Sequence, residues 1–427
     1  MEEDDWWACT IALVDDVEGG TGDGDRGSQH HRKVQAVAGA STDYRVIVLG
    51  LGGIGSAAAY WASKRLGAEV LGIEQFAFGH TRGGSEDHSR IIRLSYHRSD
   101  YVQLAKRAFE AWDALAEDAG EALVLKTGGL DLCGPESAIG LDDYRRAMTE
   151  TGVEFEEVDA VEIRRRWPQW RIDDEVEGIY QERAGIAMAT RANAAHRRLA
   201  QTNGATLLEK AAVTEIREVG GEVEVVAGDR AFRAEKLIIA AGAWTNQALS
   251  HLGLEFPLDV SLEQVVYFDS TKLDAFAPDR FPVWIWMDVP CFYGFPVFGK
   301  PAVKVSWDRC EVFTDPDHRP FEPDPATTRA IADFTGRHLP DALGPVRLAK
   351  TCLYTLTPDR DFIIDRVPGT ESVFVAVGAG HAFKFASLIG KALSDLAIEG
   401  HSDLDLSPFR ADRAILTEPN PVRSYMV

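Results

Sequence analysis

Long apolar runs, paired cysteines and basic residues are all scarce in this chain of 427 residues. No apolar stretch approaches the roughly 18 residues that a membrane-spanning helix needs. The five cysteines are scattered and form no C-x-x-C pair, which argues against a disulfide framework and against a zinc site. The eleven histidines do not cluster as metal ligands do. The sequence therefore predicts neither a membrane protein nor a metal site.

Basic residues are outnumbered by acids. Lysine and arginine number 45 against 67 aspartates and glutamates, a net charge of −22, and only 12 of the bases are lysines. So large an acidic excess argues against binding to nucleic acids or to anionic membranes. Acid-rich, lysine-poor surfaces keep proteins hydrated in high salt, so the composition predicts a halophilic source. An ordinary acidic cytosolic protein is the alternative.

The N-terminal segment lacks the features of a targeting signal and of a folded domain. It begins MEEDDWWACT, with acids where a secretory signal has a basic region, so the sequence predicts a cytoplasmic protein. The stretch EGGTGDGDRGSQHHRK contains too few apolar residues to order itself. We therefore expect residues 1–42 to form a poorly ordered acidic leader.

The rest of the chain is long enough for two domains. Three strand–glycine–helix units recur in it, the first with a strand at 45–49, a helix at 54–66 and a strand at 69–73. The segments between the units are rich in aromatic and β-branched residues, which is typical of antiparallel sheets. The pattern predicts a discontinuous, Rossmann-like α/β domain that binds a nucleotide and carries a second, β-rich domain.

The first unit contains VIVLGLGGIG, with Gly50, Gly52 and Gly55 in G-x-G-x-x-G spacing. Gly50 permits a tight turn, Gly52 lets the backbone approach a pyrophosphate, and Gly55 lets the helix pack closely. Glu74 ends the second strand, where a carboxylate can bond ribose hydroxyls. We predict dinucleotide binding from this context. A glycine-rich turn without a ligand is the alternative.

Two further segments are ambiguous when only their residues are considered. In SRIIR, Arg90 and Arg93 are three residues apart, which predicts that they share one face of a helical turn. Such a pair is usually part of a solvated surface. In KTCLYTLTPD, Cys352 could be a buried hydrophobic residue, a nucleophile, a metal ligand or an attachment point. A lone cysteine is most often inert and buried.

Seven separate motifs occur in order along the chain: GLGGIG, GHTRGGSEDHSRIIR, KTGGL, IIAAGAW, YGFPVFG…VKVSW, CLYTLTPDRDFIID and GAGHAFKFA. Together they resemble the glycine/D-amino acid oxidase superfamily of flavoproteins, most closely its branch of monomeric sarcosine oxidase and N-methyltryptophan oxidase. The resemblance runs from about Tyr44 to about Phe409.

The resemblance implies an α/β (α+β two-domain) fold, in which a Rossmann-like FAD-binding domain carries an inserted antiparallel-sheet substrate domain. On this basis we expect the FAD-binding domain to comprise residues 43–123, 183–258 and 344–412, the substrate domain 124–182 and 259–343, and a C-terminal tail 413–427.

The implied cofactor is FAD, held covalently by a thioether between Cys352 and the flavin 8α-methyl group. The resemblance places Ser89 and Arg90 against the flavin and the backbone of Val213 against the adenine. It also implies that the turn containing Gly380 and Lys384 presents a helix N-terminus to the flavin pyrimidine ring, where the helix dipole favours negative charge. The complete set expected to bind the cofactor is Gly50, Gly52, Gly55, Glu74, Ser89, Arg90, Val213, Cys352, Gly380 and Lys384.

The resemblance also implies the catalytic residues. Arg93 and Lys384 would clamp the substrate carboxylate, which suits a guanidinium and an ammonium. Tyr293 would line the active site, Lys304 would promote the reaction with oxygen over the opposite flavin face, and Arg90 would act beside the flavin.

Two positions depart from the family pattern. Sarcosine oxidases carry histidines where this chain has Glu86 and Asp308, which puts sarcosine itself in doubt as the substrate.

The expected activity is oxidation of a secondary (N-methyl or cyclic) amino acid, giving an imine, formaldehyde when the carbon was N-methyl, and hydrogen peroxide. The partners would be the amino acid and dioxygen, with no nucleic acid, no membrane and a monomeric protein. The alternatives are a flavin dehydrogenase that uses another electron acceptor, an NAD(P)-dependent dehydrogenase, and a nucleotide-binding regulatory protein without turnover.

Overall fold

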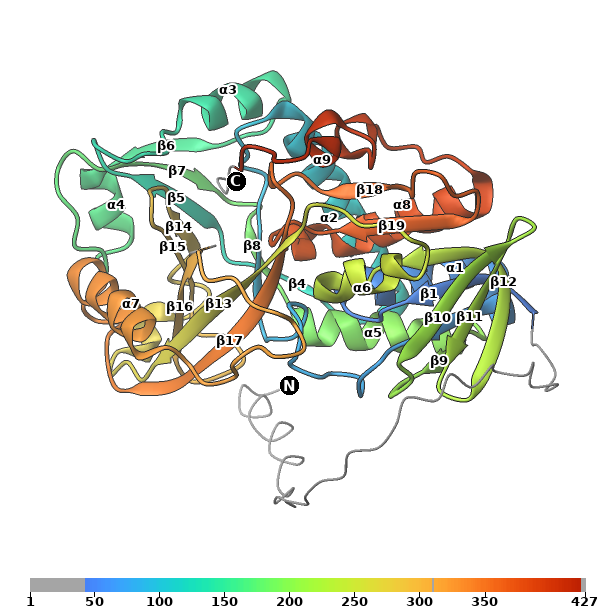
Figure 1. Ribbon diagram of the computed structural model, residues 1–427. Helices are drawn as coiled ribbons and strands as arrows, with labels where there is room; N and C mark the ends of the chain where they lie inside the picture. The colour runs from blue at the N-terminus through green and yellow to red at the C-terminus, as the bar shows by residue number, and fades with distance from the viewer. Residues whose placement is uncertain (1–42, 309–310, 424–427) are drawn as a thin grey trace, which may run out of the picture. The chain divides into compact units, whose positions relative to one another are not determined.

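The computed structural model describes residues 43–308 and 311–423, so the predicted leader lies outside the described residues. The described part forms three sheets with helices packed beside them (Figure 1). None of its helices is long and apolar enough to cross a membrane. The helices are α1 (Gly53–Leu66), α2 (Ser99–Ala119), α3 (Asp142–Glu150), α4 (Ala160–Arg166), α5 (Ala189–Thr202), α6 (Thr245–Ser250), α7 (Pro325–His338), α8 (Ala386–Glu399) and α9 (Ala414–Thr417).

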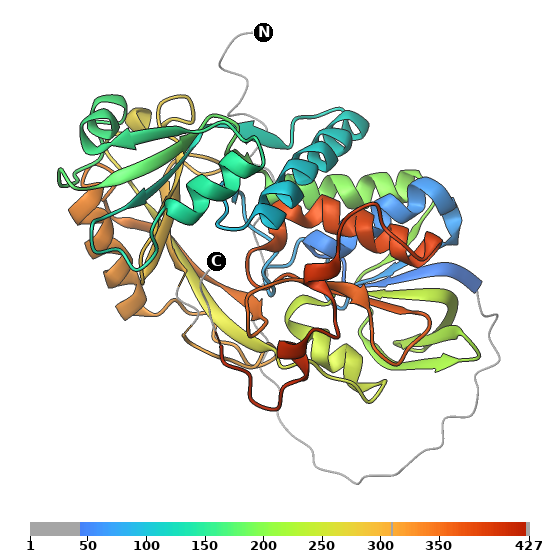
Figure 2. The same ribbon diagram turned by 90° about the horizontal axis from the view of Figure 1, so that it is seen from above.

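The first sheet contains the predicted nucleotide unit. Strand β1 pairs in parallel with β2 on one side and with β12 on the other, and β12 pairs in parallel with β19. Helix α1 packs against α5 and α8 beside this sheet (Figure 2). The strands are β1 (Asp43–Leu49), β2 (Val70–Ile73), β9 (Thr206–Leu208), β10 (Val213–Val219), β11 (Glu222–Ala227), β12 (Arg230–Ile239), β18 (Ile363–Arg366) and β19 (Val373–Val377). The predicted strand, helix and strand of the first unit are confirmed by β1, α1 and β2.

The second sheet has eight strands and is antiparallel except where β14 pairs with β5. Helix α7 covers part of it by burying Ile331 and Phe334 against its apolar side chains. The strands are β5 (Gly129–Cys133), β6 (Glu156–Asp159), β7 (Glu177–Gln181), β13 (Asp259–Phe268), β14 (Val283–Trp286), β15 (Cys291–Phe295), β16 (Val303–Asp308) and β17 (Val346–Leu356). The predicted combination of a Rossmann-like α/β layer with an antiparallel sheet is confirmed.

Strand β17 begins just after the predicted boundary between the two domains. We assigned residues 344–412 to the FAD-binding domain, but β17 pairs along its length with β13 and so lies in the second sheet. Cys352 is therefore on a strand of the antiparallel sheet. The other predicted domain boundaries stay predictions.

The third sheet corrects one prediction. Residues 90–92 form strand β3 (Arg90–Ile92), which pairs with β8 (Gly185–Ala187), and β8 also pairs with β4 (Val124–Lys126). The helical turn predicted for Arg90 and Arg93 is wrong. The two adjacent isoleucines favour a strand, and β8 supplies the pairing partner.

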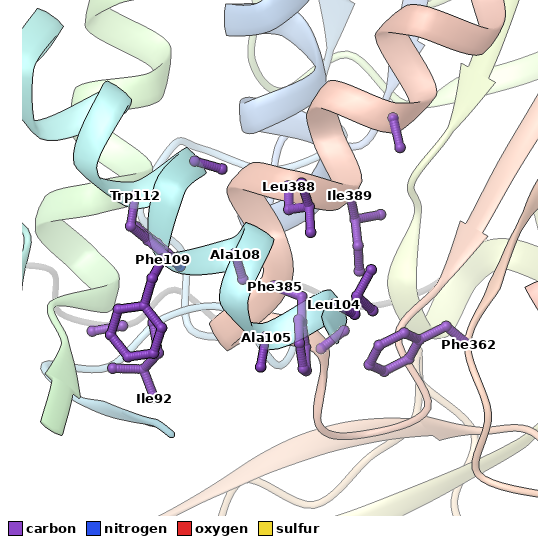
Figure 3. Close-up of a cluster of buried hydrophobic side chains, with 14 of the residues drawn as sticks. Ile92, Leu104, Ala105, Ala108, Phe109, Trp112, Phe362, Phe385, Leu388 and Ile389 are labelled. Carbon is purple, nitrogen blue, oxygen red and sulfur yellow. The ribbon is translucent and has the colours of Figure 1, made fainter. Parts of the chain in front are cut away.

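A cluster of buried apolar side chains lies between α2 and the N-terminal part of α8 (Figure 3). Leu104, Ala108 and Trp112 recur every four residues and so form one stripe on α2, which packs against Leu388 and Ile389 of α8. Burying each large apolar side chain contributes roughly 1.5–3 kcal/mol. The Trp112 indole N–H also donates a hydrogen bond of 2.7 Å to the backbone carbonyl of Lys384, which ties the turn before α8 to this core.

Candidate active site

Two neighbouring cavities lie at the carboxyl ends of β1 and β2 and along β15, β16 and β17. The larger has a volume of about 730 Å³ and the smaller about 220 Å³. Both are lined by Gly53, Ser85, Glu86 and Gly378, so they adjoin each other along these residues. Among the predicted site residues, Gly50, Gly52, Glu74 and Val213 line the smaller cavity, and the larger is lined by Arg90, Arg93, Tyr293, Lys304, Cys352, Gly380 and Lys384.

Glycine is required at two points of the turn between β1 and α1. Gly50 has a φ of +86°, and a Cβ there would lie 2.6 Å from the carbonyl oxygen of Ala240. A Cβ on Gly55 would lie 1.8 Å from the carbonyl oxygen of Gly50. The tight turn and the close helix packing that we expected of these glycines are therefore both present in the backbone.

The N-terminus of α1 faces the smaller cavity and suits an anion. Gly52 precedes the helix without a side-chain cap, and the first turn contains no acid. The Gly53 N–H donates to the Ser85 hydroxyl at 2.9 Å. The positive dipole end of a helix start suits a pyrophosphate, so these residues fit FAD.

Glu74 is buried at the rim of the same turn. It accepts hydrogen bonds from the backbone N–H groups of Leu51 at 2.9 Å and Phe76 at 3.0 Å. Burial alone would raise the pKa of Glu74, but hydrogen bonds from His80 and from these two N–H groups lower it overall. Glu74 is therefore an ionised acceptor next to the cavity, which is what a ribose hydroxyl would need.

Cys352 projects from β17 to the larger cavity. Burial raises the pKa of its thiol, although the nearby Arg90 guanidinium acts in the opposite direction. A thiol attached to the flavin would have to line this cavity, and Cys352 does so. Cys291 lines it as well, and burial raises the pKa of that thiol to about 12.

Lys304 on β16 is almost completely buried, at 3 % exposure. Its ammonium donates to Asp87 Oδ2 at 2.5 Å, to the Ser89 carbonyl at 3.1 Å and to the Ser89 hydroxyl at 3.2 Å. Asp87 also accepts from Lys350 at 2.7 Å and from the Tyr267 hydroxyl at 2.8 Å. Our sequence reasoning missed Asp87, Lys350 and Tyr267. Asp87 stands in the quoted motif SEDHSR, but its partners are distant in the chain.

Arg93 and Lys384 approach each other beside Tyr96. Arg93 Nη1 donates to Asp131 at 2.9 Å, and the Ser95 hydroxyl donates to the other oxygen of that carboxylate. Burial lowers the pKa of Lys384 to about 7, and the Arg93 charge acts in the same direction. Asp131 was also missed. Arg93 is thus held in place on the wall of the cavity by a buried acid.

Tyr293 on β15 pairs with a residue that we did not single out. Its hydroxyl lies 3.2 Å from that of Tyr354 on β17. Burial raises the pKa of both phenols, so both are protonated at neutral pH. Gly380 is needed beneath Tyr354, because a Cβ there would lie 2.6 Å from the Tyr354 ring.

Glu86 and Asp308, where we expected this chain to depart from the family pattern, both have arginine partners. Glu86 accepts from the Asn193 amide at 3.2 Å and lies 4.0 Å from Arg197. Asp308 lies 3.3 Å from Arg360 Nη2. Both acids line the larger cavity, but each has its charge compensated by an arginine.

Within residues 43–308 and 311–423, no group of three or more histidine, cysteine, aspartate or glutamate side chains could hold a metal ion.

Comparison with known proteins gives consistent matches. The family model described as FAD dependent oxidoreductase matches residues 45–396. A monomeric sarcosine oxidase from Streptomyces avermitilis is 36% identical over 369 residues, which are 84% of this chain and 95% of the relative. An N-methyl-L-tryptophan oxidase from Escherichia coli is 29% identical over 377 residues, or 87% and 99% of the two chains. The solved structure of NikD, an unusual amino acid oxidase, matches with a TM-score of 0.76 and 27% identity over 86% of this chain and 97% of that one.

Proposed function

The chain belongs to the family of FAD-dependent oxidoreductases, and from this premise we propose that it is an oxidase of a secondary amino acid. The substrate is an N-methyl or cyclic amino acid. The products are an imine, which hydrolyses to formaldehyde when the oxidised carbon is N-methyl, and hydrogen peroxide. The similarity to proteins named sarcosine oxidase and N-methyl-L-tryptophan oxidase supports this substrate class.

One observation carries the proposal: the larger cavity collects two separate sets of cations. Arg93 and Lys384 lie beside Tyr96, where they suit a carboxylate. Lys304 belongs to a different group, in which it donates hydrogen bonds to Asp87 and Ser89. An oxidase needs both a substrate anchor and a separate charge for the oxygen reaction, whereas a regulatory nucleotide-binding protein needs neither.

FAD, when bound, supplies the acceptor for the hydride equivalent of the amine and passes the electrons to dioxygen. The protein does the rest. Arg93 and Lys384 bind the substrate carboxylate and orient the amine. Tyr293 and Tyr354 offer hydroxyl groups in the same cavity. The Lys304 ammonium stabilises the negative charge that oxygen gains on reduction, and its burial strengthens that effect.

We further propose that FAD is attached covalently to Cys352, with its pyrophosphate at the start of α1 and its ribose near Glu74. The position of Cys352 in the larger cavity and the N-terminus of α1 beside the smaller cavity support this placement. The raised pKa of the Cys352 thiol means that attachment needs help to remove its proton, and the charges of Arg90 and, to a smaller extent, Lys304 favour the thiolate.

A monomeric, cytoplasmic protein from a halophilic source is the remaining part of the proposal. Relatives named monomeric sarcosine oxidase support the monomer. The net charge of −22 supports a high-salt environment.

A flavin dehydrogenase that uses another electron acceptor is the second candidate. It is favoured by the ion pair between Asp87 and Lys304, because the carboxylate partly compensates the charge that the oxygen reaction would use. The deciding experiment supplies N-methyl and cyclic amino acids in air and measures oxygen uptake and peroxide. We expect one peroxide for each amine oxidised. Turnover with an artificial dye but not with oxygen would replace the oxidase by the dehydrogenase.

A further inference from the structure

Asp87 is a buried carboxylate on which four different elements converge. Its side chain is 3 % exposed, and it lies in the loop between β2 and β3. Lys304 comes from β16, Lys350 from β17 and Tyr267 from β13, and Arg90 Nη1 of β3 lies 3.9 Å away. Lys304, Lys350 and Tyr267 donate hydrogen bonds to this acid, and Arg90 adds a nearby positive charge. A buried carboxylate is tolerated only with such partners, so the cluster is built around it.

All the hydrogen-bonding capacity of Lys304 is used within this cluster. An ammonium has three N–H groups, and Lys304 has three acceptors, namely Asp87 Oδ2 and the carbonyl and hydroxyl oxygens of Ser89. The centroid of the Phe295 ring lies 4.5 Å from its nitrogen. The side chain is therefore held as a fixed charge at the wall of the cavity, rather than as a mobile donor.

We propose that Asp87 is a positioning residue: its carboxylate keeps the buried Lys304 protonated and in place beside the larger cavity, with Lys350 as a second cation on the same anchor. The expected effect of Asp87 on reoxidation rests on the proposed function, in which Lys304 promotes the reaction with oxygen.

The electrostatics of the cluster support this role. Burial lowers the pKa of Lys304 to about 8, and the charges of Arg90 and Lys350 act in the same direction. The Asp87 carboxylate raises this pKa and so opposes them. Burial alone would raise the pKa of Asp87, but Lys304, Lys350 and Arg90 hold it well below its usual range. The carboxylate is therefore ionised at any pH at which the enzyme would work, and Lys304 is the group that titrates. The titratable and charged groups around Lys304 are Asp87 and His88 of the loop, Arg90 of β3, Tyr267 of β13, Tyr293 of β15, and Lys350 and Cys352 of β17.

The first test is the titration of Lys304 itself. The chain has only 12 lysines, so protein labelled with ¹³C-lysine should give resolvable ε-methylene signals, and Lys304→Met identifies the signal of interest. We expect that signal to titrate near pH 8 in the parent and roughly one to three pH units lower in Asp87→Asn. Asp87→Glu, which restores the charge, should recover most of the shift. An unchanged Lys304 titration in Asp87→Asn overturns the proposal.

Asp118 offers a matched control. It also accepts from a lysine, Lys64 at 2.5 Å, and from a tyrosine, Tyr60 at 2.6 Å, but it lines neither cavity. Asp118→Asn should leave the Lys304 titration unchanged. If it shifts that titration as much as Asp87→Asn does, the effect is a general loss of charge and the proposal fails.

The second test links the anchor to turnover. In Asp87→Asn, reoxidation of the reduced protein by oxygen should be about five-fold or more slower at pH 8 and should recover as the pH is lowered, because Lys304 regains its proton. In the Lys304→Met background, the same substitution should change nothing. A further loss in that background would mean that Asp87 acts by another route and would overturn the proposal. The Lys304 signal could shift in Asp87→Asn while Lys304→Met reoxidises at the parent rate. That result would support the positioning role of Asp87 and would contradict the oxygen role of Lys304 in the proposed function.

Discussion

Arg93 and Lys384 are brought together beside one aromatic ring, with the Arg93 guanidinium carbon 5.1 Å and the Lys384 nitrogen 5.8 Å from the centroid of Tyr96. Burial, and after it the repulsion between the two like charges, lowers the pKa of Lys384 to about 7. An anion bound near both would relieve the repulsion. The pair is therefore ready to accept a carboxylate, and its affinity should depend on pH.

We expect a carboxylic acid ligand without an amine to bind more weakly as the pH rises above about 7. Only protonated Lys384 attracts the anion, so Kd should rise by up to about tenfold per pH unit until the affinity of the neutral lysine is reached. Below pH 7 the affinity should be constant, because Lys384 is already charged. Calorimetry between pH 6 and pH 9 measures this. In Lys384→Met, binding should be weak at every pH, whereas a flat profile in the parent would contradict the carboxylate role.

Covalent attachment of FAD should depend on Cys352 and on no other thiol. Cys352→Ser should release its flavin on acid precipitation, while the parent should stay yellow and fluorescent on a denaturing gel. Cys291→Ser is the sharper control, because Cys291 lines the same cavity. If Cys291→Ser also loses the flavin, or if the parent releases all of it, attachment at Cys352 is wrong. Cys310 lies outside the described residues.

The features predicted from sequence are those that the local backbone determines. The turn at Gly50 and Gly55 could be predicted because only glycine meets those backbone contacts, and the family suggested by the seven motifs is confirmed by the matching model. Arg90 could not be placed correctly, because its strand depends on β8, which is remote in the chain. Asp87 was missed for the same reason: Lys304 and Lys350 lie 217 and 263 residues away from it. A buried charge network depends on tertiary contacts, which cannot be predicted from a local sequence pattern.

High salt should stabilise this protein. The net charge of −22 leaves many carboxylates without a basic partner, and their repulsion is screened as the Debye length falls from about 10 Å at 0.1 M to about 3 Å at 1 M. Surface ion pairs such as Arg146–Asp143 will weaken at the same time, but each contributes only about 0–1 kcal/mol. The Tm should therefore rise between these salt concentrations. A Tm that is unchanged or lower in 1 M salt would refute the halophilic interpretation.

Replacing Lys304 should separate the two half-reactions of the proposed oxidase. Dioxygen gains negative charge as it is reduced, and the Lys304 ammonium is a buried, fixed charge that can stabilise it. Lys304→Met should slow reoxidation by about 10²–10³-fold, since that is the typical cost of losing one preorganised stabilising group. Reduction by substrate without air should change far less, because the carboxylate is assigned to Arg93 and Lys384. Lys384→Met should show the opposite pattern, with weaker substrate binding and nearly normal reoxidation. Stopped-flow absorbance measures both steps, and reoxidation of Lys304→Met at the parent rate would show that oxygen reacts elsewhere.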